Sequence, residues 1–276
     1  MSHHNFFNKA KIGFIGAGNM GQAIIRGLLA GGMDPQRICA TAKTKRKLDY
    51  LESKYGIRTL KNNEEVVDIC DVIILAVKPQ DLYEVIEPIA KSFSDDKIVI
   101  SLAAGIPLVN LKKWLLDVNK IIRLMPNTPV NLGKGLIGYC MSEAAEYLSS
   151  DLEHFLSPLG EVIFADEDDP FQALTVGCGS GVGFVFEIMI YWQEWLEEHG
   201  FSAVDARKMV VQTFLGASEL AKSQEQTTIE ELQRKVVSKK GVTHAGLNSM
   251  RELEMERALR VSFEKAVLRD KELGRT

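Results

Sequence analysis

Short apolar runs and amphipathic segments alternate through the first 165 residues. The runs are rich in valine, isoleucine and leucine, as strands that are buried on both faces require. The segments between them follow the helical period. We expect strands at 12–15, 37–40, 72–77, 98–102 and 120–125, edge strands at 135–141 and 160–165, and helices at 22–30, 46–55, 82–93 and 108–116. This alternation predicts an α/β fold with a doubly wound, parallel sheet and right-handed crossovers.

The pattern changes near residue 165. An acidic run at 166–169 precedes Pro170, and both suit the first turn of a helix. Almost no strand patterning follows. We expect helices at 171–198, 203–223, 228–236 and 247–272. The sequence therefore predicts two domains, a doubly wound sheet domain over 1–165 and an all-α domain over 166–276.

The first helix of the all-α domain is apolar on almost every side between residues 184 and 195. A helix that is apolar all round must be buried on all sides, and a domain of this length can hardly bury it alone. We infer that a second copy of the chain covers it, in a homodimer formed through this domain. The alternative is that the helix packs between the two domains of one chain.

Gly16, Gly18 and Gly21 follow the first predicted strand with the spacing G-x-G-x-x-G. The first glycine allows the bend, the second lets a pyrophosphate approach the backbone, and the third lets the helix pack on the strand. The spacing alone is a weak signal, but here an apolar strand precedes it and a helical pattern follows it. The sequence predicts a Rossmann-like, dinucleotide-binding domain over 1–165, with an ordinary strand–turn–helix as the alternative.

The residues after the second predicted strand indicate which dinucleotide is bound. An acidic residue there would accept hydrogen bonds from an adenosine ribose and repel a 2′-phosphate. The chain instead has two threonines and four basic residues between 41 and 47. Hydroxyl and cationic donors suit a phosphate, so we expect NADP(H) to be preferred over NAD(H), with Lys43 and Thr44 as the contacts. A solvated basic helix start is the alternative.

Other predicted strands also end in small or polar residues. Lys78, residues 101–105 and residues 125–128 all stand at carboxyl ends, where ligands gather in open α/β sheets. The Ala103–Gly105 stretch leaves room for a flat nicotinamide ring, and a plain strand-to-helix turn is the alternative interpretation.

Composition narrows the classes of partner. The net charge of −4 gives no general electrostatic reason to bind nucleic acid or an anionic membrane. We find no apolar run of membrane-spanning length and no long apolar signal core at the start, so we do not expect export. The four cysteines lie far apart without a C-x-x-C pair, which favours a reduced, cytoplasmic protein with free thiols and no metal site.

Five segments carry a resemblance to a known family. They are GFIGAGNM (13–20), DVIILAVKPQ (71–80), ISLAAGI (100–106), IRLMPNTP (122–129) and QTFLGASELAKS (212–223). With these segments the chain resembles the pyrroline-5-carboxylate reductase family through nearly its whole length. The resemblance implies an NAD(P)H-dependent oxidoreductase that reduces 1-pyrroline-5-carboxylate to L-proline, the last step of proline biosynthesis. It also implies a Rossmann domain followed by a helical, dimer-forming domain, sometimes assembled into larger rings.

The resemblance also implies which residues contact the cofactor. They correspond to the diphosphate loop, to the surroundings of the adenosine ribose and to the walls around the second ribose and the nicotinamide. The expected residues are Ile15, Gly16, Ala17, Gly18, Asn19, Met20, Thr41, Ala42, Asn63, Ala76, Val77, Lys78, Pro79, Leu102, Ala103 and Ala104. Lys43 and Thr44 complete this cofactor-binding set.

The family's substrate loop, S-P-G-G-T/A-T, corresponds to residues 238–243. Lys239 and Lys240 replace its proline and its first glycine, and the family's S-G-S-G-P-A-Y helix start is also altered, at 178–184. The expected substrate-binding residues are Ser238, Gly241, Val242 and Thr243. The departures from the family pattern therefore cluster around the substrate rather than around the cofactor.

Reduction of an imine needs a hydride on carbon and a proton on nitrogen, and a protonated iminium accepts hydride readily, so positioning is the protein's main task. Thr243 is the candidate catalytic residue, with its Oγ1 hydrogen-bonded to the ring nitrogen; a helix N-cap is its alternative role. Backbone N–H groups at 241–243 suit a substrate carboxylate. Lys239 and Lys240 either add charge beside an anionic substrate or form a solvated turn, and His244 is more often structural or exposed in such a place.

Two other functions stay open at this stage. One is a reductase of another cyclic imine or ketone, which the altered substrate loop favours. The other is a non-catalytic, NADP-binding regulator, against which the retained glycine and threonine of the loop argue.

Overall fold

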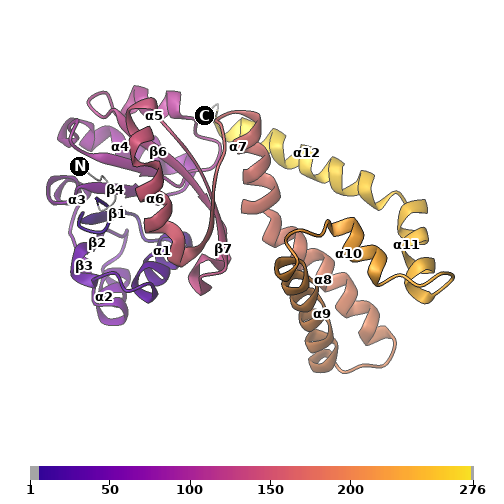
Figure 1. Cartoon of the computed structure of the whole chain (residues 1–276). Coiled ribbons are helices and arrows are strands. Elements are labelled where there is room, and N and C mark those ends of the chain that lie inside the picture. Colours follow the sequence, from indigo (N-terminus) through magenta and orange to yellow (C-terminus); the bar gives the residue numbers. More distant parts are fainter. Residues whose placement is uncertain (1–5, 275–276) are drawn as a thin grey trace. The chain divides into compact units, whose positions relative to one another are not determined.

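The described residues, 6–274 of the computed structural model, contain one eight-stranded sheet (Figure 1). Its strands are β1 (Ile12–Ile15), β2 (Ile38–Ala40), β3 (Arg58–Thr59), β4 (Val72–Leu75), β5 (Ile98–Ser101), β6 (Lys120–Pro126), β7 (Gly135–Met141) and β8 (Gly160–Phe164). Their order is β3-β2-β1-β4-β5-β6-β7-β8, and every neighbouring pair is parallel except β6 and β7. The predicted Rossmann-like, doubly wound sheet is confirmed.

The direction in which the chain adds strands reverses at β1, which lies between β2 and β4. Ile12 pairs with Ile38 on one side and with Val72 on the other. A crevice forms outside the carboxyl ends of the strands at such a switch point, and open α/β proteins bind their ligands there. The glycine-rich turn after β1 therefore stands at the expected place for a ligand.

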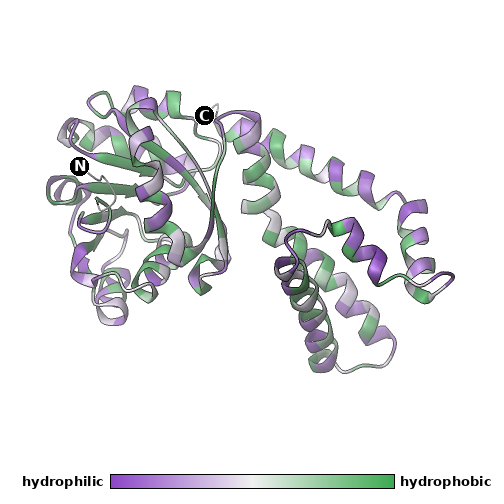
Figure 2. Ribbon diagram, viewed as in Figure 1, coloured by the Kyte–Doolittle hydropathy of each residue, from purple (hydrophilic) through white to green (hydrophobic). Residues whose placement is uncertain are grey.

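Helices cover the two faces of the sheet, and after β8 the described chain contains helices without further strands. They are α1 (Asn19–Ala30), α2 (Lys45–Tyr55), α3 (Asn63–Ile69), α4 (Leu82–Ile86), α5 (Leu108–Trp114), α6 (Ser149–Leu156), α7 (Asp169–Leu174), α8 (Gly181–Glu198), α9 (Ala203–Ser223), α10 (Ile229–Lys235), α11 (Val242–Glu252) and α12 (Met255–Leu273). Alternate residues of β1 enter different cores, with Phe14 on one face of the sheet and Ile15 on the other. Figure 2 shows the central strands as mostly hydrophobic, because both of their faces are buried.

Several elements differ from the sequence expectation. The helix expected at 82–93 is α4 followed by a 3₁₀ segment, Glu87–Ser92, since Pro88 interrupts the α-helical hydrogen bonds. The helix expected at 247–272 is two helices, α11 and α12, separated where Glu254 adopts a φ of +52°. The strand β3 and the helices α3 and α6 were not expected.

The described chain forms two compact units. The first runs to Ser180 and includes the residues from Ala266 onward, and the second is Gly181–Lys265. The strands end with β8, close to the expected boundary at 165, but the helical residues up to Ser180 and the last turns of α12 belong with the sheet. The expected domains 1–165 and 166–276 therefore mark where strands end rather than where the compact units divide.

The second unit leaves much of its apolar surface uncovered. Only Leu196, Ala206 and Val210 form a buried apolar cluster among its described residues, whereas the side chains of Phe186 and Trp195 are 58% and 54% exposed. The helical stretch Asp169–Glu198, which contains a π-helical turn, is long and apolar enough to cross a membrane by length and composition. The expectation that no apolar run reaches this length is wrong, because one 18-residue window of the stretch has a mean hydropathy of 1.7 although polar residues are scattered through it.

Candidate functional site

The fold restricts the residue at two of the three glycines around the junction of β1 and α1. Gly16 has a φ of +87°, and a Cβ on it would lie 2.7 Å from Val77 Cγ1. A Cβ on Gly21 would lie 3.3 Å from the Cβ of Ala76, so its absence lets α1 pack against the end of β4. Both positions are therefore fixed by the fold, whether or not a ligand is bound.

Gly18 differs from the other two glycines because a Cβ there would meet only the Ala76 carbonyl oxygen, at 3.9 Å. The fold itself does not require glycine at this position. Gly18 is also the N-cap of α1, and no side chain caps the helix. The first-turn N–H groups and the positive end of the helix dipole are thus free of side-chain acceptors, which is the arrangement that binds a diphosphate.

Backbone hydrogen bonds align the ends of four neighbouring strands. Thr41 N donates to Phe14 O at 2.9 Å and Ala76 N donates to Ile15 O at 2.9 Å. Leu102 N donates to Leu75 O at 3.1 Å. The predicted cofactor residues at 15–20, 41–44, 76–79 and 102–104 consequently lie along one edge of the sheet, beyond β1, β2, β4 and β5.

Thr41 joins two further members of the predicted cofactor set. Its side chain is buried, and its Oγ1 donates to Asn63 Oδ1 at 2.7 Å and accepts from Gly16 N at 3.4 Å. Asn63 is the first residue of α3, whose N-cap, Asn62, accepts a hydrogen bond from Glu65 N. The glycine turn, the end of β2 and the start of α3 are therefore tied together by one threonine hydroxyl.

The basic segment after β2 is exposed and carries an acidic neighbour that we did not expect. Lys43 Nζ lies 3.0 Å from Asp81 Oδ2, and the lysine side chain is 83% exposed. Thr44 is the N-cap of α2 but makes no side-chain cap hydrogen bond. An exposed pair of this kind is weak and open to exchange with another anion. Ala42, next to Lys43, and Pro79, which precedes Asp81, are half-buried, while Lys78 is exposed.

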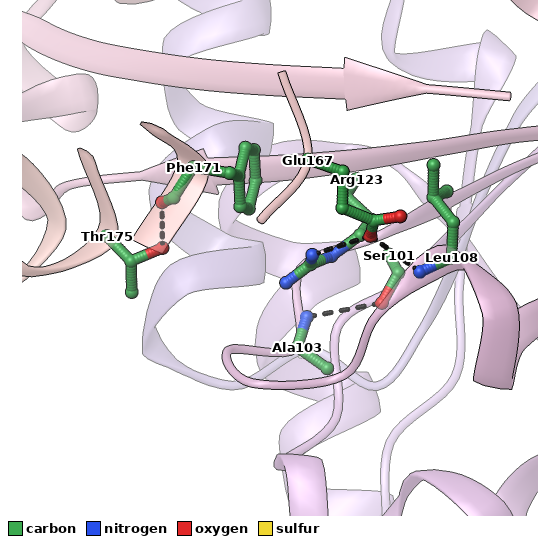
Figure 3. A network of polar contacts seen from close by, with 7 residues as sticks. All are labelled: Ser101, Ala103, Leu108, Arg123, Glu167, Phe171 and Thr175. Atoms are coloured by element: carbon green, nitrogen blue, oxygen red, sulfur yellow. Dashed lines mark hydrogen bonds and ion pairs between the residues drawn. The ribbon is translucent and has the colours of Figure 1, made fainter. Parts of the chain in front are cut away.

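The loop from β5 to α5 is held by polar contacts that the sequence did not reveal (Figure 3). Ser101 Oγ accepts a hydrogen bond from Ala103 N at 3.3 Å. Glu167 Oε1 accepts one from Leu108 N at 2.7 Å and pairs with Arg123 Nη1 at 2.9 Å. The loop that contains the predicted nicotinamide wall at 102–104 is thereby held at its start and at its end.

Arg123, from the RLMPNTP segment, is buried behind that loop. Its guanidinium carbon lies 4.4 Å from the centroid of the Phe171 ring, and Thr175 Oγ1 donates to Phe171 O at 2.8 Å (Figure 3). An arginine that is both ion-paired and stacked holds its position tightly. The motif that carries the family resemblance therefore has a structural role in the first unit.

The predicted substrate residues belong to the second unit, whereas the predicted cofactor residues belong to the first. Gly241 is the N-cap of α11, and its N–H donates to Ser238 O at 3.0 Å. The Ser238 side chain leaves no space for a Cβ on Gly241. Val242 and Thr243 are exposed in the first turn of α11. The alternative role of Thr243 as an N-cap is wrong, because Gly241 occupies that position.

Lys240 adopts a left-handed backbone conformation, with a φ of +59°, at the position where the family has its first glycine. The loop therefore keeps a backbone shape suited to glycine although the residue has changed. His244 is exposed and its Nε2 lies 3.3 Å from Asn248 Nδ2 on the next turn of α11.

Three of the four free thiols, those of Cys39, Cys70 and Cys140, are buried. Cys39 and Cys70 are buried beside Gly13, whose missing side chain leaves room for Cys70. A hydrogen bond from Cys70 lowers the pKa of Cys39 to about 7, and the same contact together with burial raises the pKa of Cys70. Burial raises the pKa of Cys140 to about 12. Within residues 6–274 no group of three or more histidine, cysteine or acidic side chains could hold a metal ion.

These features define a class of protein. A glycine turn at the switch point of a doubly wound sheet, followed by helices with exposed apolar faces, is the architecture of an NAD(P)-dependent oxidoreductase with a helical association domain. A family profile described as NADP oxidoreductase, coenzyme F420-dependent, matches residues 11–105, and one described as pyrroline-5-carboxylate reductase dimerisation matches residues 168–273. The chain belongs to the pyrroline-5-carboxylate reductase family.

Similarity to individual relatives extends over the full chain. The pyrroline-5-carboxylate reductase of Vibrio alginolyticus is 33% identical over 264 residues, covering 95% of this chain and 97% of the relative. A pyrroline-5-carboxylate reductase structure from Coxiella burnetii is 33% identical with a TM-score of 0.89, covering 98% and 100% of the two chains. The Plasmodium falciparum pyrroline carboxylate reductase structure, which has NADP bound, is 25% identical with a TM-score of 0.86, covering 96% and 98%.

Proposed function

We propose that the chain reduces 1-pyrroline-5-carboxylate to L-proline in the cytoplasm, with NADPH as the preferred hydride donor. The observation that carries the proposal is the glycine turn at the switch point, in a chain that matches pyrroline-5-carboxylate reductases from end to end. Bound NADPH supplies a hydride to the ring carbon of the C=N bond, and a proton on the ring nitrogen completes the amine. The chain's own residues bind and orient the two reactants.

The turn after β1 fits a dinucleotide. Gly18 offers an open approach to the backbone, and the uncapped start of α1 offers N–H donors to the diphosphate. The hydroxyl of Thr41, fixed by Asn63, stands where the adenosine ribose is expected. Residues 76–79, which are half-buried except for the exposed Lys78, and the loop at 102–104 form the walls around the second ribose and the nicotinamide.

The preference for NADPH rests on the segment after β2. No carboxylate follows β2 directly, and Lys43 and Thr44 are exposed there. A 2′-phosphate carries more charge than the Asp81 carboxylate that now faces Lys43, so it would displace this weak surface contact. The NADP in the Plasmodium falciparum relative supports the same preference.

On the substrate side, we assign the first turn of α11 to the carboxylate of the imine. The Gly241 N–H is already bonded to Ser238 O, which leaves the N–H groups of Val242 and Thr243 without a side-chain cap. The helix α11 is long enough to have a substantial dipole that favours an anion at this end. The exposed Thr243 Oγ1 accepts a hydrogen bond from the N–H of the protonated ring nitrogen, which keeps the proton there while hydride arrives. Lys239 and Lys240 add positive charge around an anionic substrate.

We also assign the functional unit as a homodimer formed through the helical domain. The exposed aromatic side chains of α8 form an apolar surface that is costly to leave in water. The family profile that matches this region describes a dimerisation domain. In a symmetric dimer the same apolar face of each copy packs against the other, so that one contact buries both faces. Burial against a second copy explains the apolar surface of this long helix, so that no insertion into a membrane is needed to cover it.

The test is a spectrophotometric assay of NADPH consumption with 1-pyrroline-5-carboxylate, together with calorimetric titration of NADPH and NADH. We expect rapid consumption, proline as the product and tighter binding of NADPH. Consumption only with another cyclic imine or ketone would replace the substrate. Tight NADPH binding without any turnover would identify a regulator instead, and no binding of either dinucleotide would overturn the proposal.

A further inference from the structure

The end of the chain packs directly on the loop from β5 to α5. Gly105, in this loop, has a φ of +74°, and a Cβ on it would lie 2.5 Å from the Asp270 carbonyl oxygen and 2.7 Å from Leu273 Cβ. Asn110 Nδ2 donates to Gly274 O at 3.1 Å. These residues all belong to the first compact unit, so the last turns of α12 and the loop form one packed structure.

Asp270 is the charged residue at the centre of this contact. It is buried, with 7% of its surface exposed, although nothing in the proposed chemistry requires a carboxylate there. Burial raises the pKa of the Asp270 carboxyl above its ordinary value, although the charge of Arg123 and a backbone hydrogen bond from Gly105 act in the opposite direction. A carboxylate is expensive to bury, and it is retained where its contacts hold a structure in place.

Arg123 and Asp270 also line the same polar cavity, of about 260 Å³, beside Gly105 and Pro107. Arg123 Nε, Gln172 Oε1 and Asp270 Oδ1 are buried without a hydrogen-bond partner among the described residues, and all three residues line this cavity. Gly105 and Pro107 of the loop form part of the cavity lining, so the polar groups around the cavity contact the loop directly.

We propose that Asp270 is a positioning residue that holds the β5–α5 loop, and with it the nicotinamide wall at 102–104, in the geometry needed for hydride transfer. The inference rests on the proposed function, because it takes residues 102–104 as that wall. Ser101 holds the start of the loop and Glu167 holds its end at Leu108. Asp270 holds the middle, at Gly105, one residue beyond the wall.

The reason for an effect on rate is geometric. Hydride transfer requires the donor and acceptor carbons to be held in a near-attack arrangement, and a misplacement of about 1 Å can cost a hundred-fold in rate. The larger side chains of the loop, Leu102 and Ile106, pack into the cores of the sheet, but residues 103–105 between them carry nothing larger than a methyl group. The C-terminal helix therefore supplies rigidity that the sequence of the loop lacks.

The test compares Asp270→Ala with Asp270→Asn, which keeps an acceptor for the Gly105 N–H. Glu272→Ala serves as the matched control, because Glu272 lies on the same helix but is exposed and pairs with Arg269. Three quantities are measured: hydrogen exchange of residues 102–110 in the free protein, kcat with NADPH, and the Kd of 2′,5′-ADP, which mimics the adenosine half of NADP.

We expect Asp270→Ala to raise exchange in the loop and to lower kcat by about ten-fold, with the Kd of 2′,5′-ADP unchanged within about two-fold. Asp270→Asn and Glu272→Ala should match the parent protein in all three. Unchanged loop exchange in Asp270→Ala would overturn the anchoring role. Raised exchange with an unchanged kcat would overturn its link to the nicotinamide wall.

A second variant keeps the inference testable if Asp270→Ala does not fold. Gly274→Ala places a methyl group against the Gly105 carbonyl oxygen and pushes on the loop without removing the carboxylate. It should reproduce the raised exchange and the lower kcat, and normal values for both would contradict the inference. If the parent protein itself shows no turnover, the proposed function fails. Loop exchange and the ratio of the NADPH and 2′,5′-ADP affinities would then decide the role of Asp270 separately.

Discussion

The two compact units bury their apolar residues in different ways. In the first unit, residues such as Phe14, Ile73 and Leu75 are almost completely buried on the two faces of the sheet. In the second, the largest aromatic residues of α8 are about half exposed and the buried cluster is small. A self-contained core lets the first unit hold a cofactor by itself, whereas the second depends on a partner to complete it.

The largest effect should come from breaking the partner surface of the second unit. Phe186→Glu combined with Trp195→Glu places two charges where we expect aromatic contacts in the dimer. Each such contact is worth about 2 kcal/mol or more, so the dimer dissociation constant should rise by roughly a thousand-fold. Light scattering after gel filtration measures this, and kcat/KM should fall with the dimer fraction.

Leu116→Glu is the control for this experiment, because Leu116 is an apolar residue of the first unit that is 82% exposed. It should leave the oligomeric state unchanged. A monomeric parent protein, or a double variant that stays dimeric, would contradict the assigned role of the α8 surface.

The next largest effects on NADPH affinity should come from two glycine variants in the first unit. Together they distinguish an effect on folding from an effect on cofactor binding. Gly16→Ala puts a side chain at a φ of +87° and close to Val77, so it should cost about 1–2 kcal/mol of stability as well as NADPH affinity. Gly18→Ala has open space around its Cβ. It should leave the thermal midpoint unchanged yet weaken NADPH binding by about ten-fold or more, because the methyl group would obstruct the diphosphate.

Thermal unfolding and NADPH titration of both variants provide the measurement. The informative result is the difference between them. If Gly18→Ala bound NADPH normally, the turn after β1 would not be the diphosphate site, whatever its glycine spacing.

The sequence predicted the first unit better than the second for a physical reason. Strands such as β1 and β7 are buried by their own chain, so their apolar runs have clear ends, and both were predicted residue for residue. The two-residue strand β3 is too short to show a pattern. The break before α12 falls at Glu254, in a left-handed conformation that neither glycine nor proline announces.

In the candidate site, too, the features that are local in sequence were predicted and the contacts between distant segments were not. The glycine turn and the strand ends are local in sequence, so spacing was enough to place them. The pairs Arg123–Glu167 and Gly105–Asp270 join distant segments, and no local pattern indicates them. A signal was available for α3, since Asn62 followed by Glu65 is a helix start, and it would have explained why Asn63 reaches Thr41.

A smaller effect should follow from Thr243→Ala in the second unit. The side chain is exposed and does not cap α11, so stability should not change. Loss of one hydrogen bond to a charged group costs about 1.5–3 kcal/mol, which corresponds to a fall in kcat/KM of roughly ten-fold or more. Thr243→Ser retains the hydroxyl and should keep most of the activity. Steady-state kinetics that match the parent protein would remove Thr243 from the reaction.

The smallest effect should come from the exposed pair Lys43–Asp81 in the first unit. Lys43→Ala removes one cation that faces the 2′-phosphate, so NADPH affinity should fall by about three- to ten-fold while NADH affinity stays constant. Asp81→Ala removes the competing carboxylate and should raise NADPH affinity by up to about three-fold. Both changes should shrink as ionic strength rises, because the charges are exposed. Calorimetric titration at two salt concentrations measures them. Equal changes for NADPH and NADH would mean that Lys43 does not contact the 2′-phosphate, and the preference between the dinucleotides would then lie with Thr41 and Thr44.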